Sequence, residues 1–271
     1  GTSPTRTERA TRLRHTPRAD RVAAMASRDA ILEHARELLD LDNFHDYGPM
    51  GVQVVGADEV TKIAASVSSS LEAFRRTKEA GAELLVVHHG QYWENEPRIV
   101  DLAMKRRLQA LFEGDITLAA YHLALDAHPE IGNNIIVARE LGIAEPQRFL
   151  EWGFGGLLAE PATLEELTQR LEETTGRPPQ VFEGGPERIE RVAVITGGAA
   201  RLVRDAAAAG YDAFVTGEPA EPTLHLAREL GIHFLAGGHY ATETFGIKAL
   251  AEKLAGEFSI DWEFVDVPVP V

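Results

Sequence analysis

Hydrophobic and polar positions along the chain follow two alternating periods. Apolar residues recurring every three or four positions predict helices over residues 27–39, 71–80, 100–112, 134–141, 164–175, 199–209, 222–230 and 241–255. Short apolar runs predict strands over residues 61–67, 83–88, 116–122, 180–183, 192–196, 213–216, 233–236 and 260–265. Strands that alternate with helices are typical of an α/β protein, and largely parallel pairing is expected.

The pattern changes near the middle of the chain. Residues 149–160 are glycine-rich and extended, and the Pro178-Pro179 pair makes a stiff break. We expect a second lobe here, with residues 136–237 forming much of it. No low-complexity linker separates the parts, so residues 27–271 should form two lobes that share an interface.

The first residues differ in charge from the rest of the chain. Seven of the 27 basic residues lie in the first 28 positions, where Glu8 and Asp20 are the only two of 42 acidic residues. Residues 1–26 are expected to be a disordered basic tail or an extension, with Met25 as a candidate natural start and a transit peptide as the alternative. The acidic body disfavours nucleic-acid binding by charge neutralisation.

Composition also narrows the location and the chemistry. No apolar stretch approaches the roughly 20 residues that cross a bilayer, and no hydrophobic centre of a secretory signal is visible, so a cytoplasmic protein without membrane contact is expected. Cysteine is absent, which excludes disulfides, thiolate nucleophiles and cysteine-type zinc sites. A metal ion would therefore be bound by nitrogen and oxygen atoms.

Two adjacent histidines end the apolar strand predicted near residue 88. The sequence Leu84 to Gly90 reads LLVVHHG, which places His88 and His89 at the carboxyl end of a buried strand, where parallel sheets bind ligands. Gly90 would permit the sharp turn that lets both imidazoles serve one site. The alternative is a pair of histidines hydrogen-bonded at a strand end.

A second polar cluster follows the strand predicted over residues 116–122. Asp126 is the strongest candidate ligand, because a carboxylate there can bridge two cations. His122 could be a ligand, a partner of a ligand or a proton carrier, whereas His128 is expected to be structural or exposed. Asn133 or Asn134 could cap the next helix.

The third cluster lies where the last long helix begins. His239 and Glu243 are four residues apart, so both project from one face of a helical turn and can reach the same cation. The alternative is that His239 is an ordinary loop histidine and that Glu243 is there because a helix N-terminus favours a negative charge. Glu218 follows another strand and either lies beside the metal ligands, faces the substrate or caps a helix. His225 and His233 are expected to be packing or surface histidines.

These three motifs, with Asp42–Phe44 and Phe214–Glu218, closely resemble the Nif-three-like dinuclear metal-centre family, the GTP cyclohydrolase I type 2 homologues. The resemblance runs in the same order from residue 31 to 254 and is weakest over residues 145–190. It implies two interlocked α/β/α lobes and toroidal homohexamers whose metal sites face an internal cavity. It also implies that the metal ligands are His88, His89, Asp126, His239 and Glu243, with His122 close to the metals.

Two divalent cations about 3.5–4 Å apart make water a nucleophile near neutral pH, which favours hydrolysis. A ligand set without sulfur suits zinc, iron or manganese. We therefore expect a metal-dependent hydrolase acting on a nucleotide-like or other small substrate, with His122 as the proton-transfer group. The alternative is a non-catalytic metal-binding or protein-interaction module, and a DNA-handling toroid is disfavoured by the acidic surface.

Overall fold

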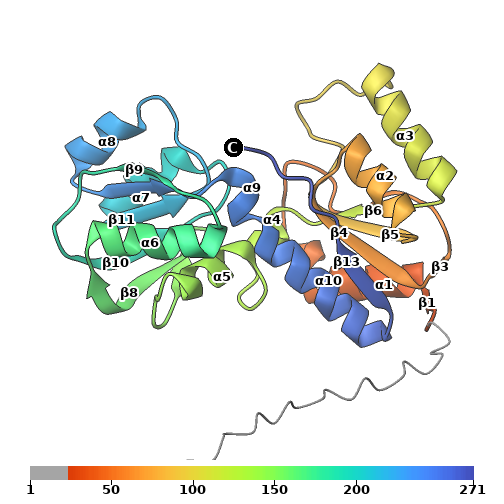
Figure 1. The fold of residues 1–271 in the computed structure, drawn as a ribbon, viewed down its shortest axis with the longest axis horizontal. Coiled ribbons are helices and arrows are strands. Elements are labelled where there is room, and N and C mark those ends of the chain that lie inside the picture. The colour runs from red at the N-terminus through yellow and green to blue at the C-terminus, as the bar shows by residue number, and fades with distance from the viewer. Residues whose placement is uncertain (1–23) are drawn as a thin grey trace, which may run out of the picture.

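Two β-sheets divide the protein into two lobes (Figure 1). The computed structural model of the chain describes residues 24–271. The sheet of the first lobe has five strands in the order β13-β4-β5-β6-β2, and the sheet of the second lobe has six in the order β7-β8-β10-β11-β12-β9. Most of the expected basic tail lies outside the described residues. Its last residue, Ala26, is buried and pairs with Val60, so the expected tail is too long at that end.

Helices cover both faces of the first sheet. Its strands are β2 (Gly51–Val54), β4 (Lys62–Ser68), β5 (Leu84–His89), β6 (Thr117–Ala120) and β13 (Asp261–Phe264). One face packs against α1 (Arg28–Leu38) and α10 (Thr244–Phe258), and the other against α2 (Leu71–Glu79) and α3 (Leu102–Gly114). A short ribbon of β1 (Ala26–Ser27) and β3 (Glu59–Val60) lies beside it.

The strand that carries the paired histidines is buried on both faces. Leu84 and Val86 belong to the core shared with α1 and α10, whereas Leu85 and Val87 belong to the core shared with α2 and α3. A central parallel strand between two helical layers has no solvent-facing side, and this is why its sequence is continuously apolar instead of alternating.

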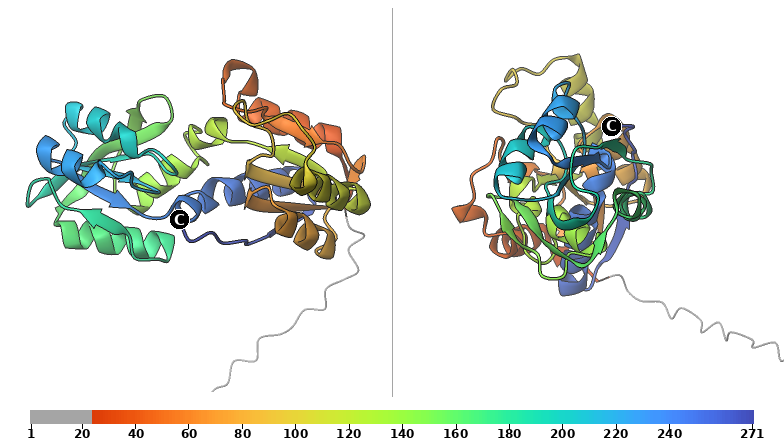
Figure 2. Two further views of the ribbon diagram at one scale, coloured as in Figure 1. Left: turned by 90° about the horizontal axis from the view of Figure 1, so that it is seen from above. Right: turned by 90° about the vertical axis from the view of Figure 1, so that its left-hand side faces the viewer.

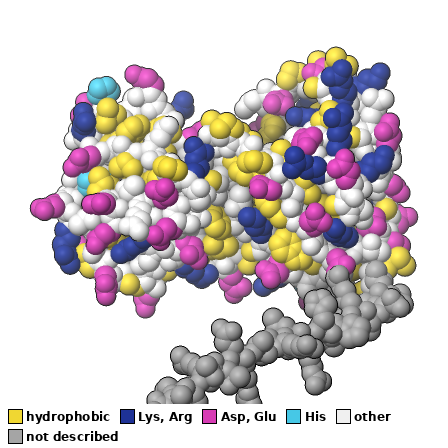
Figure 3. All heavy atoms as spheres, viewed as in Figure 1, with side chains coloured by type: hydrophobic (Ala, Val, Ile, Leu, Met, Phe, Trp, Pro, Cys, Tyr) yellow, Lys and Arg dark blue, Asp and Glu magenta, His cyan; other side chains and the backbone are white. Residues whose placement is uncertain are grey.

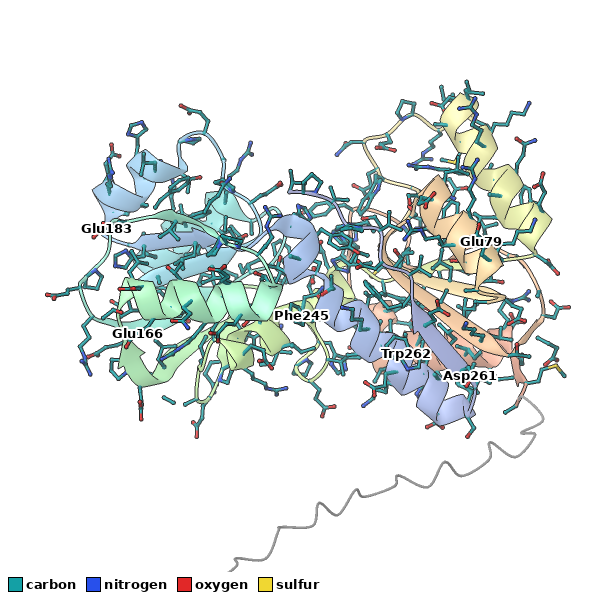
Figure 4. The ribbon with its side chains drawn as sticks, viewed as in Figure 1. Glu79, Glu166, Glu183, Phe245, Asp261 and Trp262 are labelled. Carbon is teal, nitrogen blue, oxygen red and sulfur yellow. The ribbon has the colours of Figure 1, made fainter. Side chains whose placement is uncertain are left out.

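The second lobe repeats this three-layer arrangement. Its strands are β7 (Gln147–Phe149), β8 (Gly153–Ala162), β9 (Gln180–Phe182), β10 (Ile189–Val194), β11 (Ala213–Thr216) and β12 (His233–Ala236). One face packs against α5 (Asn133–Glu140) and α6 (Leu164–Thr175), and the other against α7 (Val203–Ala208) and α8 (Thr223–Leu230). Glu166, labelled in Figure 4, closes a capping box with Thr163 at the start of α6.

The α/β class and the interlocked α/β/α lobes are confirmed, but each sheet combines parallel and antiparallel pairs. Strands β13, β4, β5 and β6 are parallel, as are β10, β11 and β12. The antiparallel pairs are β2 with β6 in the first lobe, and β7 with β8, β8 with β10 and β9 with β12 in the second. Two expected helices are also interrupted: η2 (Ala200–Leu202) precedes α7, and α9 (His239–Thr242) precedes α10.

Two segments near the C-terminus join the lobes. Phe245, at the start of α10, packs against the second lobe's core, while Ile247 and Leu250 belong to the first (Figure 4). The residues after β13 then run back toward α9, as Figure 2 shows, where the carbonyl of Val271 accepts a hydrogen bond from Tyr240 N at 3.1 Å. Between residues 24 and 271 no helix has the length and apolar composition needed to span a membrane.

Candidate metal centre

The carboxyl ends of the central strands of both sheets face one cavity of about 770 Å³. The first lobe contributes residues that follow β5 and β6, and the second lobe contributes residues that follow β10, β11 and β12. Parallel strands end at the same sheet edge, so side chains far apart in sequence meet there. The polar lining includes His89, His122, Asp126, Thr196, Glu218, His239 and Glu243.

All five candidate ligands come together at this cavity: His89, Asp126, His239 and Glu243 line it, and the fully buried His88 lies behind them. Their nitrogen and oxygen atoms form overlapping groups within 4.8 Å: His88, Asp126 and Glu243 make one, and His89, His239 and Glu243 make another. Asp126 lies at the end of the short helix α4 (Leu123–Asp126). Nitrogen and carboxylate oxygen atoms at this spacing could hold a metal ion in each group.

Glu243 connects the two groups. Its Oε1 lies 3.6 Å from His88 Nε2, and its Oε2 lies 3.2 Å from Nε2 of both His89 and His239. Asp126 Oδ2 lies 3.4 Å from His88 Nε2, but Oδ1 accepts a hydrogen bond from Asn133. Among these carboxylates, Glu243 thus contacts the imidazoles of both groups, whereas Asp126, the bridging candidate from the sequence, approaches only His88.

Each histidine around the cavity has Nδ1 occupied by a neighbouring group. The Nδ1–H of His88 donates to a backbone carbonyl, and that of His122 donates to the buried carboxylate of Asp46. Such contacts fix the ring orientation and leave Nε2 for a cation. The Nδ1 distances are 3.0 Å for His88 to Tyr121 O, 3.1 Å for His89 to Ser68 Oγ, 2.8 Å for His122 to Asp46 Oδ1 and 3.3 Å for His239 to Glu218 Oε1.

Two buried atoms at the centre fit a metal ion well. His88 Nε2 and Glu243 Oε2 have no hydrogen-bond partner among the described residues, although both side chains are almost completely buried. In a neutral His88 ring, Nδ1 carries the proton that Tyr121 O accepts, so Nε2 presents a lone pair toward two carboxylates. Acceptors that face one another in this way need a cation between them, a metal ion or a proton. A nitrogen and oxygen ligand set suits zinc, iron or manganese.

Without a metal ion, protons would balance the carboxylates. Burial raises the pKa of Glu243, but the charges of His89 and His88 outweigh it and hold the pKa well below its usual range. Burial lowers the pKa of His239, yet the hydrogen bond and charge of Glu243, with the charge of Glu218, raise it to about 9. Metal ions and protons therefore compete for the same atoms.

His122 lies directly beside the candidate ligands His88 and His89. It forms a third group with His88 and His89 within 4.8 Å, and its ring centroid is 5.0 Å from that of His88. Its partner Asp46, which the sequence did not single out, lies in the turn-rich segment before β2 and also accepts from Leu123 N. This geometry suits a ligand as well as a proton-transfer group.

The remaining histidines and asparagines have separate structural roles. His128 Nδ1 accepts from the backbone of a turn, His225 is exposed, and His233 is buried and bonded to residues 184–186. Neither asparagine caps a helix, contrary to the expectation. Instead, Asn133 binds Asp126 Oδ1 and Gly246 N, and thereby orients the carboxylate from the α10 side.

At two positions beside the site, a side chain lies close to the backbone of a glycine. The amide end of Gln53 lies where a Cβ of residue 90 would be, and Gly90 does not have the positive φ of the sharp turn that was expected. Gly197, with φ +69°, would place a Cβ 2.1 Å from Glu243 Oε1. A side chain at position 197 would therefore displace the central carboxylate.

Aromatic side chains complete the cavity and were not expected from the sequence. Tyr47 and Trp93 line it from the first lobe, and Trp152 lines it from the loop between β7 and β8. Trp93 packs edge-on against His122 with ring centroids 5.1 Å apart. Single aromatic residues in loops have no periodicity, so no sequence pattern marks them as neighbours of the histidines.

Known proteins match the chain over most of its length. The Duf34/NIF3 (NGG1p interacting factor 3) family profile matches residues 26–269. A "GTP cyclohydrolase 1 type 2 homolog" of Pseudomonas aeruginosa is 42% identical over 246 residues, covering 89% of this chain and 97% of the relative. The solved structure of protein ybgI is 39% identical with a TM-score of 0.87, and that of TTHA1606 from Thermus thermophilus is 36% identical with a TM-score of 0.86. Each alignment covers 91% of this chain and all of the other.

Proposed function

Because the chain belongs to the Duf34/NIF3 family, we propose that it binds two divalent metal ions and acts as a metal-dependent hydrolase. His88, Asp126 and Glu243 would hold one ion, and His89, His239 and Glu243 the other. The position of Glu243 carries this proposal, since its two oxygens face two different sets of imidazoles. Zinc, iron and manganese all suit the ligands.

Two bound cations would supply Lewis-acid activation of water and of the substrate. The cavity volume of about 770 Å³ suits a small molecule, and the names of the curated relatives favour a nucleotide-like substrate such as GTP. Trp93 and Tyr47 would exclude water from the first-lobe side. His122, held by Asp46, would move a proton at Nε2, the nitrogen that Asp46 leaves free.

A metal-ligand role for His122 is the alternative within this proposal, because His122 shares a group with His88 and His89. The metal content of His122→Ala separates the two roles. A proton-transfer residue leaves the metal content unchanged, whereas a ligand lowers it as His88→Ala does.

Activity screening tests the catalytic part of the proposal. The zinc-, iron- and manganese-loaded protein would be assayed with nucleotides, phosphoesters and cyclic amides beside Asp126→Ala. Turnover that Asp126→Ala abolishes while its fold is retained would support a hydrolase. A fully loaded protein inactive toward every substrate would favour the second candidate function, a non-catalytic metal-binding or protein-interaction module.

An apolar surface favours that second candidate. Ile99, Val100, Leu102 and Phe112, in and before α3, are each more than 60% exposed, and Figure 3 shows hydrophobic side chains near the start of α3. Exposed apolar groups of this kind mark protein contacts. We propose that copies of this chain form a closed homohexamer, as the family resemblance implies, and that neither nucleic acid nor membrane is a partner.

A further inference from the structure

Two buried hydrogen-bond donors in the cavity wall have no partner among the described residues. Thr196 is 6% exposed and its Oγ1 is unbonded; the Nε1 of Trp152 is also buried and unbonded. Both residues line the same cavity as Asp126 and Glu243. Neither belongs to the proposed metal-ligand set, so the metal ions alone do not explain them.

Asn134 holds both residues beside the metal centre. Its Oδ1 accepts from Thr196 N at 2.6 Å, and its Nδ2 donates to Trp152 O at 2.9 Å. The same Nδ2 lies 3.4 Å from Asp126 O, so one side chain joins the two residues to the end of α4, which carries a proposed ligand. Thr196 also directly precedes Gly197, the residue packed against Glu243.

Buried polar groups are almost always paired in native proteins, and an unpaired one needs a physical explanation. An indole N–H can only donate, and a threonine hydroxyl donates readily. An oxygen acceptor would satisfy either donor, and the cavity that both residues line is where such an acceptor could be bound. An ordered water could accept these bonds, but an oxygen of a molecule bound at the metals would do so equally well.

We infer that Trp152 Nε1 and Thr196 Oγ1 donate hydrogen bonds to an oxyanion oxygen, phosphoryl or carboxylate, of the molecule bound at the metal centre. The inference rests on the proposed function, because the metal ions would hold the other end of that group. These two residues are binding residues on the second-lobe wall. They select ligands that present an acceptor oxygen toward that wall.

A hydrogen-bond donor that pairs only with a ligand does not stabilise the folded protein when the ligand is absent. Thr196→Val, which replaces the hydroxyl by a methyl group, should leave the unfolding midpoint unchanged or higher. Loss of a hydrogen bond to a structural water would lower the midpoint instead. Unfolding of the zinc-loaded protein by urea, with Thr168→Val as the control, distinguishes these cases, since Thr168 Oγ1 is bonded to Leu164 O in α6.

The three tryptophans of the chain allow a direct observation of the contact. Indole-labelled, zinc-loaded protein should give three N–H signals, which Trp152→Phe and Trp262→Phe assign. Trp262 lies in β13, in the outer part of the first lobe (Figure 4). Addition of inorganic phosphate or acetate should shift the Trp152 signal and leave that of Trp262 in place.

Calorimetric titration with the same two probes measures the contribution to affinity. Trp152→Phe and Thr196→Val should each weaken binding of phosphate or acetate about 5- to 10-fold at unchanged zinc content, whereas Trp262→Phe and Thr168→Val should not. The probe whose affinity falls more in Trp152→Phe and Thr196→Val shows whether the ligand oxygen is phosphoryl or carboxylate. Unchanged affinities of Trp152→Phe and Thr196→Val for both probes, no binding by the fully loaded unaltered protein, or a static Trp152 signal would overturn the inference. A zinc content near zero would instead refute the proposed metal centre, and the inference with it.

Discussion

Alanine at Glu243 should remove both metal ions, whereas alanine at Asp126 should remove only one. Glu243 is 2% exposed and places one oxygen near His88 and the other near His89 and His239. Asp126 approaches only His88. We expect about two equivalents of zinc for the unaltered protein, about one for Asp126→Ala and almost none for Glu243→Ala.

The rise in Tm on adding zinc can be calculated for each bound ion. At a free zinc concentration one hundred times Kd, each site stabilises the folded state by about 2.7 kcal/mol. For a chain of this length that energy raises Tm by roughly 5–10 °C per site. The zinc-dependent shift should therefore be about twice as large for the unaltered protein as for Asp126→Ala, and close to zero for Glu243→Ala.

Elemental analysis and scanning calorimetry, each performed with and without a chelator, measure both quantities. The chelated samples separate metal binding from any direct effect of the substitutions on folding. His225→Ala, on an exposed position of α8, is the control and should match the unaltered protein. One equivalent of zinc in Glu243→Ala would show that Glu243 does not bridge. Loss of both ions in Asp126→Ala would return that role to Asp126.

Other expected outcomes concern neighbouring groups, the C-terminus and assembly. His122→Ala should keep its zinc and lower turnover about 10²-fold; zinc loss equal to that of His88→Ala would identify a ligand. Asn133→Ala should lower the free energy of unfolding in urea by about 1–3 kcal/mol because two buried partners lose their bonds, and an unchanged midpoint would contradict this. Deleting residues 266–271 should lower Tm, since the backbone and hydroxyl of Tyr240 lose their acceptors; an equal Tm would show that the contact adds no stability. Light scattering should give a mass several times 29.6 kDa, and a value of 29.6 kDa at all concentrations would exclude the hexamer.

The clustering of the candidate ligands could be predicted because strand ends are visible in sequence. An apolar run that stops at His88, or at Gly238 before His239, marks the edge where parallel sheets bind ligands. The three-layer fold follows from the same runs, since strands buried on both faces need helices on both sides. Even the spacing of His239 and Glu243 gave the correct conclusion that both reach one group.

Other features depend on distances that no local pattern contains. The contact of Glu243 with both groups of imidazoles depends on how the two lobes meet, and Asp126 faces only His88 while Asn133 is bonded to its other oxygen. Asp46 and Trp152 lie in irregular segments, where periodicity gives no information. Edge strands such as β9 have only three residues, so their antiparallel direction depends on the completed sheet.

The position of β13 in the sheet order has a consequence for the order of folding. Among the strands described between residues 24 and 271, β13 is synthesised last, yet it pairs with β4, about two hundred residues earlier. The second lobe's strands all lie between residues 147 and 236, so that sheet can be completed while the first still lacks its final strand and α10. Pairing across a long loop is entropically costly and slow. On the ribosome the middle of this sequence can therefore fold before its beginning does, and Glu243 comes to lie beside His88 and His89 only when the N-terminal strands find their C-terminal partner.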